Sequence, residues 1–101
     1  MVYNKLVRDK IPQIIAASGK KCVTEVLTED AYLQKLDEKL SEELAEYQES
    51  KSLEELADLL EVMAAVVKAR GYSWEELECI RVRKREKRGG FEERILLIES
   101  E

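Results

Sequence analysis

The fold is decided by residues 30–70, DAYLQKLDEKLSEELAEYQESKSLEELADLLEVMAAVVKAR. Leucines recur in this stretch every three or four residues, which is the spacing of one face of an α-helix. The pattern breaks once, where Ser52 and Glu55 have the spacing of a helix-capping box. We therefore predict two long helices, from about Asp30 to Glu49 and from Ser52 to Arg70, that lie antiparallel because the loop between them is short.

Two further helices are predicted outside this pair. Asp9 is placed to cap a first helix, which carries Pro12 in its first turn and stops at Gly19. Ser73 begins another capping box, and the helix that it opens runs from Trp74 to about Lys87, before two glycines.

Two short strands complete the prediction. Residues 21–27 and the tail 91–99, which contains the apolar run Ile95–Ile98, have strand-like composition. Two short strands are unstable alone, so we expect them to pair with each other against the helices. The predicted fold is mainly α: a single domain, residues 1–101, forming an antiparallel helical bundle with two short accessory β-strands. Because so small a domain buries little core, we expect a homodimer to complete it, with a tetramer as the alternative.

Charge is divided unevenly along the chain. The net charge is −5, yet residues 25–61 hold thirteen acids and three lysines, whereas residues 81–88 hold six basic residues and one acid. This division suggests one site for a cation and another for an anion, although solvated helix faces give the same pattern. The overall acidity and the lack of interleaved aromatic residues argue against a nucleic-acid binder.

Several function classes are excluded by residue types. The chain has no histidine, and Cys22 and Cys79 are far apart in sequence, so a zinc site and histidine-based catalysis are not expected. Free, buried thiols are the simpler interpretation of the two cysteines. No signal peptide and no apolar stretch of membrane-spanning length is evident, so we expect a cytoplasmic protein without a membrane partner.

Four acids fall where apolar residues are expected. On the first long helix, Glu43 continues the row Leu36, Leu40 and Tyr47, and Glu46 lies at the edge of that face, whereas Glu42 is predicted to face solvent. On the second long helix, Glu55 and Asp58 lie beside the main apolar arc, three residues apart on one face.

The antiparallel arrangement brings these two acidic pairs together. Unpaired buried carboxylates cost several kcal/mol each, and a hard divalent cation such as Mg²⁺ offsets that cost. Periodicity does not distinguish this from the alternative that all four acids are surface residues of Glu-rich helices.

Three blocks of sequence resemble one enzyme family. The pattern Glu42-Glu43-x-x-Glu46 followed by Glu55-x-x-Asp58 is similar to the metal motif of MazG-like, all-α nucleoside-triphosphate pyrophosphohydrolases. The opening block, Tyr3 to Pro12, and the late block Lys84-x-x-Lys87-Arg88-Gly89-Gly90-Phe91 resemble a compact, phosphoribosyl-ATP pyrophosphohydrolase-like branch. The resemblance covers nearly the whole chain.

The resemblance implies Mg²⁺-dependent hydrolysis of an α–β phosphoanhydride, giving a nucleoside monophosphate and pyrophosphate, with Mn²⁺ as a substitute metal. It implies an assembly of two protomers and a nucleotide substrate. By this resemblance the metal ligands are Glu43, Glu46, Glu55 and Asp58, the catalytic acids Glu43 and Glu46, and the phosphate-binding residues Lys5, Arg8, Lys84 and Arg88. Eight residues separate Glu46 from Glu55, fewer than in many MazG proteins, so the pocket is expected to be small or differently shaped.

Two alternatives stay open. One is hydrolysis of phosphoribosyl-ATP in histidine biosynthesis, as opposed to the clearance of non-standard nucleotides. The other is a non-catalytic, dimeric nucleotide-binding module. Trp74 is interpreted as a core or dimer anchor, because aromatic side chains dominate cores and interfaces.

Overall fold

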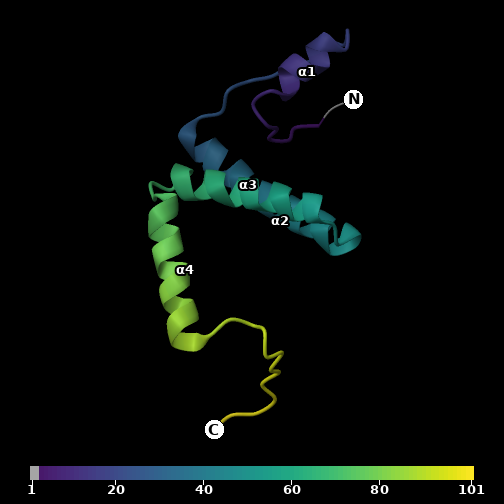
Figure 1. The fold of residues 1–101 in the computed structure, drawn as a ribbon. Helices are drawn as coiled ribbons and strands as arrows, with labels where there is room; N and C mark the ends of the chain where they lie inside the picture. The colour runs from purple at the N-terminus through teal and green to yellow at the C-terminus, as the bar shows by residue number, and fades with distance from the viewer. Residues whose placement is uncertain (1–2) are drawn as a thin grey trace.

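The computed structural model describes residues 3–101, which form four α-helices and no β-strand. The helices are α1 (Ile11–Ala17), α2 (Glu29–Ser50), α3 (Leu53–Ala69) and α4 (Trp74–Arg88), as Figure 1 shows. The prediction of a mainly α fold is confirmed. Within the described part of the chain, no helix combines the length and apolarity needed to cross a membrane.

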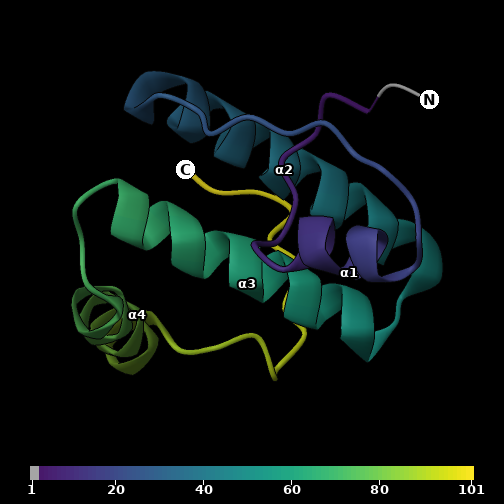
Figure 2. The ribbon, with the colours of Figure 1, turned by 90° about the horizontal axis from the view of Figure 1, so that it is seen from above.

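The centre of the fold is the hairpin of α2 and α3. Two residues connect the helices, and Figure 2 shows them side by side and antiparallel. Lys51 turns the chain with a left-handed φ of 59°, and its backbone N–H donates to the carbonyl of Tyr47 at 2.7 Å. Ser52 then caps α3, its Oγ accepting from the backbone N–H of Glu55 at 3.3 Å. Both long helices lie within one or two residues of their predicted bounds.

An apolar row on α2 forms the seam of the hairpin. The row has alternating spacings of three and four residues, as in coiled-coil packing, and consists of Leu33, Leu36, Leu40, Glu43 and Tyr47. Leu36 is the sole buried hydrophobic side chain in residues 3–101, at 2% exposure, and Glu43 is the buried charged one. The predicted placement of Glu43 in an apolar row is confirmed.

The last helix leaves the hairpin instead of closing a bundle. Gly71 ends α3 with a φ of +88°, a conformation that glycine adopts without strain, and the predicted cap Ser73 opens α4. Figure 1 shows α4 turning away from the hairpin. In the described residues α4 contacts α3 and not α2, so within one protomer the antiparallel packing is that of α2 against α3.

Both predicted strands are wrong. Residues 21–27 and 91–99 have no ladder partner within the described chain, and the side chains that should have packed are open to solvent. Val23 and Val26 are 101% and 99% exposed, and the side chains of Ile95–Ile98 are 77–82% exposed. A strand forms only when a second strand satisfies its backbone, and the two segments lie on opposite sides of the α2–α3 hairpin (Figure 1).

Local details at the N-terminal side also differ from prediction. Asp9 does not cap α1: the N-cap is Lys10, which makes no side-chain cap bond, although Pro12 is in the first turn as expected. Helix α2 begins one residue earlier than predicted, and Thr28 caps it by accepting from the backbone N–H of Ala31. The cysteines Cys22 and Cys79 are free, as expected, but exposed rather than buried, because the segments that carry them are not packed into a core.

Replacement of Leu36 by alanine should destabilise the protein strongly. Because Leu36 is the most completely buried side chain, we expect Leu36→Ala to lower the free energy of unfolding by about 2–5 kcal/mol, measured by urea denaturation. Leu97→Ala removes the same atoms at a position that is 77% exposed and should change stability by less than about 0.5 kcal/mol. Equal losses in the two variants would contradict the assignment of the core.

Candidate metal centre

Glu43 is the acid on which the candidate site is built. Its position in the apolar row of α2 turns it toward α3, and it is 7% exposed. From α3, Glu55 and Asp58 approach it, both of them half-buried. Each of these three acids has a carboxylate oxygen within 4.8 Å of the others, which is close enough for one cation to contact all three.

Glu46 belongs to a second, overlapping group. It is exposed, and its carboxylate lies within 4.8 Å of those of Glu42 and Glu43, all on α2. Glu43 is therefore shared by both groups. The structure brings three of the four predicted ligands, Glu43, Glu55 and Asp58, into one group. Glu46 lies beside this group on its solvent side, next to Glu43.

Two buried oxygens in the site lack partners. Oε2 of Glu43 and Oε2 of Glu55 are inaccessible to solvent, and no hydrogen-bond donor in residues 3–101 reaches them. Leaving a buried carboxylate oxygen unsatisfied is costly, and such an oxygen in a native fold calls for an explanation. A hard divalent cation accepts oxygen ligands of this kind, so the donor set fits Mg²⁺ or Mn²⁺.

The environment of Glu43 disfavours its charge. Burial raises the pKa of Glu43 above its ordinary value, and hydrogen bonding with Glu46 and repulsion by its charge raise it further. The ammonium of Lys39, 3.4 Å from Glu43 Oε1, acts in the opposite direction. A raised carboxyl pKa that results from burial and neighbouring acids is typical of functional sites.

Glu42 was placed wrongly by the helical pattern. Its side chain is only 27% exposed and accepts hydrogen bonds from Lys5 at 3.2 Å and from Lys39 at 3.3 Å. Burial raises its pKa, but the two lysines outweigh burial and hold the pKa of Glu42 below its ordinary value. Glu42 is turned inward because these cations lie on that side of α2.

Lys39 is a site residue that the sequence reasoning missed. Its ammonium contacts both Glu42 and Glu43. The sequence does indicate this contact, because Lys39 precedes Glu42 and Glu43 by three and four residues, a spacing at which side chains on a helix meet.

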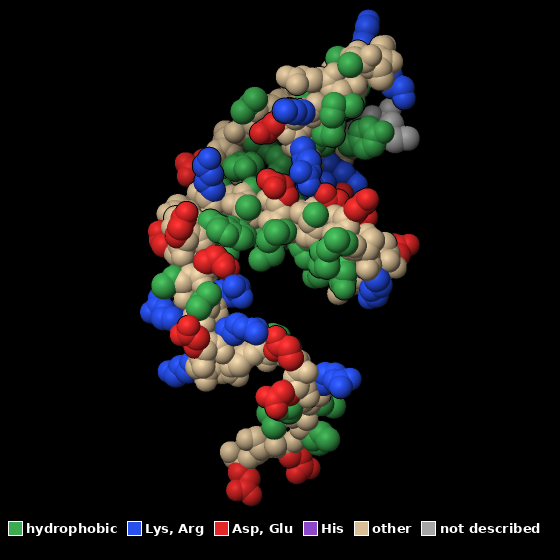
Figure 3. All heavy atoms as spheres, in the orientation of Figure 1, with side chains coloured by type: hydrophobic (Ala, Val, Ile, Leu, Met, Phe, Trp, Pro, Cys, Tyr) green, Lys and Arg blue, Asp and Glu red, His purple; other side chains and the backbone are tan. Residues whose placement is uncertain are grey.

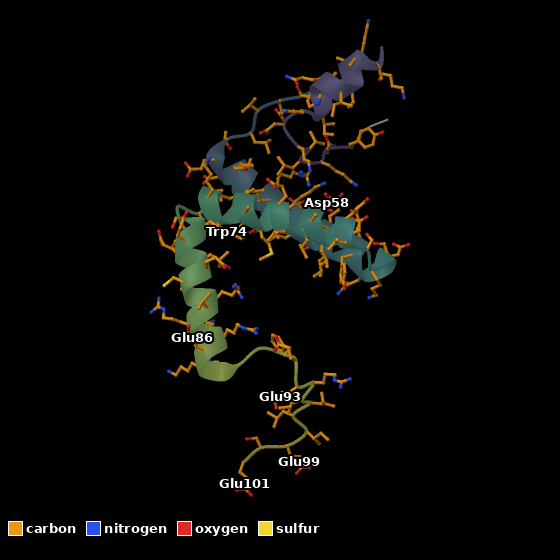
Figure 4. The ribbon with its side chains drawn as sticks, in the orientation of Figure 1. Asp58, Trp74, Glu86, Glu93, Glu99 and Glu101 are labelled. Carbon is orange, nitrogen blue, oxygen red and sulfur yellow. The ribbon has the colours of Figure 1, made fainter. Side chains whose placement is uncertain are left out.

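The N-terminal segment supplies two cations to the acids. Arg8 donates from Nη2 to Oδ1 of Asp58 at 2.7 Å, and Lys5 reaches Glu42. Figure 4 shows Asp58 on the side of α3 that faces this segment. Lys5 and Arg8, predicted to bind phosphate, therefore lie at the acidic site, although they are 37 and 50 residues away from their respective partners in sequence.

Lys84 and Arg88 are not at this site within one protomer. They line a shallow concavity formed by α4 alone, together with Ile80, Arg83 and Lys87. Figure 4 shows α4 leading away from Asp58, from Trp74 at its start to Glu86 near its end. The predicted cation site therefore lies on the α2–α3 hairpin, and the predicted anion site lies on α4.

Comparisons with known proteins supply no family. No family model matches the chain, and no solved structure matches it. An uncharacterized protein of Mycolicibacterium smegmatis (strain ATCC 700084 / mc(2)155) is 52% identical over 42 residues. The alignment covers 42% of this chain and 43% of that protein, so the chain spans less than half the length of this relative.

The raised pKa of Glu43 predicts how stability depends on pH without metal. The folded state holds this proton more tightly than the unfolded chain does, so the contribution of Glu43 to stability falls as pH rises from 4.5 through its folded pKa. Glutamine does not ionise, and Glu43→Gln should therefore gain stability relative to wild type over this range. Urea denaturation in EDTA at a series of pH values tests this, and parallel pH profiles would contradict it.

Proposed function

We propose that the chain is a Mg²⁺-dependent nucleotide pyrophosphohydrolase of the cytoplasm, with Mn²⁺ as a substitute metal. In this proposal it cleaves the α–β phosphoanhydride of a nucleotide, releases a nucleoside monophosphate and pyrophosphate, and clears non-standard nucleotides. Its functional form is a homodimer, with a tetramer as the alternative. The observation that carries the proposal is the pair of buried, unpartnered oxygens of Glu43 and Glu55, next to Asp58.

The acids supply both the metal ligands and the general base of the proposed reaction. Glu43, Glu55 and Asp58 would hold the cation, and Glu46 would complete the ligand set from the solvent side. When bound, Mg²⁺ neutralises phosphate oxygens and lowers the pKa of a water molecule. Glu46 is exposed at the edge of the cluster, so it is placed to accept a proton from an attacking water, and Glu43 is the second candidate for this general base.

The cations of the N-terminal segment are candidates for contacts to substrate phosphate. Arg8 and Lys5 are bound to the acids and more than half exposed, at 59% and 54% of their side chains. A cation bound by the acids would compete with these ion pairs and leave Arg8 and Lys5 free for phosphate oxygens. Arg8 suits bidentate contact with phosphate, and Lys5 acts as a point charge.

Lys84 and Arg88 are assigned to the leaving pyrophosphate, whose developing charge they would neutralise. Since α4 does not reach the acids of its own chain, this role requires α4 of one copy to lie beside the acidic hairpin of another.

A non-catalytic nucleotide-binding module is the second candidate. The observation in its favour is that the acids already have cationic partners in the chain, because Arg8, Lys5 and Lys39 form ion pairs with Asp58, Glu42 and Glu43. These pairs leave the two buried oxygens unsatisfied, which is why the metal-dependent enzyme is the preferred proposal.

The reaction predicts a specific product. Wild-type protein with Mg²⁺ should release pyrophosphate, and no single phosphate, from at least one member of a panel of nucleoside triphosphates and phosphoribosyl-ATP, and EDTA should abolish the release. We expect Glu55→Gln to lower kcat/KM at least about tenfold, since it alters the metal site. Glu61→Gln, an exposed acid on the same helix, is the matched control and should retain activity.

The panel also separates the alternatives. A preference for phosphoribosyl-ATP would assign the histidine pathway, and a preference for a modified base would assign nucleotide clearance. If folded wild-type protein binds nucleotide but turns over no member of the panel, the enzymatic proposal is wrong and the binding module replaces it.

A further inference from the structure

Helix α3 carries two apolar rows, of which the hairpin covers one. Leu59, Val62 and Val66 form a half-buried row. A second row lies about 100° further round the helix and is open to solvent. The exposures of its residues are 80% for Leu53, 41% for Leu56, 51% for Leu60 and 39% for Met63. A helix that is apolar around so much of its circumference is usually enclosed on more than one side.

The exposed row has the spacing of a helix–helix seam. Its residues follow one another by three, four and three positions, the repeat with which one helix packs along another. Toward α4 the row continues into a concavity lined by Val67, Tyr72 and Trp74, together with Ala64, Lys68 and Ser73. Figure 3 shows hydrophobic side chains along α3 facing the hollow that α4 and the C-terminal tail border.

The exposed surface of the protomer is too large for a self-contained chain. Its accessible surface is 9500 Å², whereas a folded monomer of this mass has about 5,900 Å². The radius of gyration is 17.9 Å, against about 13 Å for a compact domain of this length. The excess of roughly 3,600 Å² per protomer is larger than the roughly 1,000–2,500 Å² that each partner buries in the interface of a permanent homodimer.

Charge indicates which partner fits. The α2–α3 hairpin lies in the acidic region, residues 25–61, and α4 contains the basic run, residues 81–88. A hairpin seated in the hollow would contact both the apolar row of α3 and the basic α4. The hairpin of a second copy offers an apolar row to pack against the row of α3, and its excess of acidic residues suits the basic α4.

We propose that a second copy of this chain covers the exposed row of α3, in a two-fold symmetric pair in which each α4 flanks the acidic hairpin of its partner. In such an isologous interface the same surface of both copies is buried, and Leu60, near the middle of α3, lies close to the symmetry axis. This specifies the surface of the homodimer in the proposed function and does not depend on the proposed reaction.

Molecular mass in solution tests the interface. By light scattering after size exclusion at micromolar concentration, wild-type protein should have twice the chain mass of 11.7 kDa. Leu60→Glu places a charge in the seam and should weaken dimerisation at least about 100-fold, because an unpaired buried charge is strongly unfavourable. Ile14→Glu, at a 60% exposed position on α1, is the control and should remain dimeric.

Cross-linking keeps the test decisive if Leu60→Glu does not fold, which circular dichroism would show. In a Cys22→Ser/Cys79→Ser background, a short bismaleimide should join two chains through Leu60→Cys and not through Ile14→Cys. A monomeric wild type, a folded Leu60→Glu variant that stays dimeric, or equal cross-linking at both positions would overturn the interface. None of these results depends on pyrophosphate release, so the interface and the reaction can fail separately.

Discussion

The burial of the Glu43 carboxyl in the apolar seam between α2 and α3 is the constraint on which the candidate site depends. Leu36 and Leu40 precede it in the same row, so the packing that holds the hairpin together also removes Glu43 from water. The desolvation of a carboxylate is expensive unless cations or donors compensate for it. Lys39, on the same helix, compensates in part through one oxygen and leaves the other without a partner. The packing of the hairpin therefore buries a carboxyl group that the chain's own cations compensate only in part.

The sequence predicted those features that depend on neighbours along the chain. Ser52 and Ser73 cap their helices as expected, and the position of Glu43 follows from helical spacing, because caps and helix faces are local properties. The strands at 21–27 and 91–99 were wrong because pairing depends on where distant segments meet. The prediction that Glu42 faces solvent was wrong for a similar reason. Lys5, from a segment remote in sequence, contacts Glu42 on its inward side, and a helical pattern contains no information about that contact.

The acidic site and the exposed apolar row occupy different sides of the hairpin. Asp58 faces the N-terminal segment in Figure 4, whereas the hydrophobic side chains of α3 in Figure 3 face the hollow beside α4. Pairing through the apolar row would therefore leave the acids open to a nucleotide. It would also place the basic residues of α4 next to a hairpin that they do not reach within their own chain. One arrangement thus accounts for the open shape of the protomer and for the separation of its acidic and basic regions.

Calorimetric titration of metal-free protein with Mn²⁺ tests directly whether these acids form a metal centre. Wild type and Glu61→Gln should bind Mn²⁺ with the same affinity, and Glu55→Gln should bind it at least about tenfold more weakly, because this variant loses one of the ligands that the hairpin brings together. Equal affinities for Glu55→Gln and wild type, or no binding by folded wild-type protein, would contradict the assignment of these acids as a metal centre.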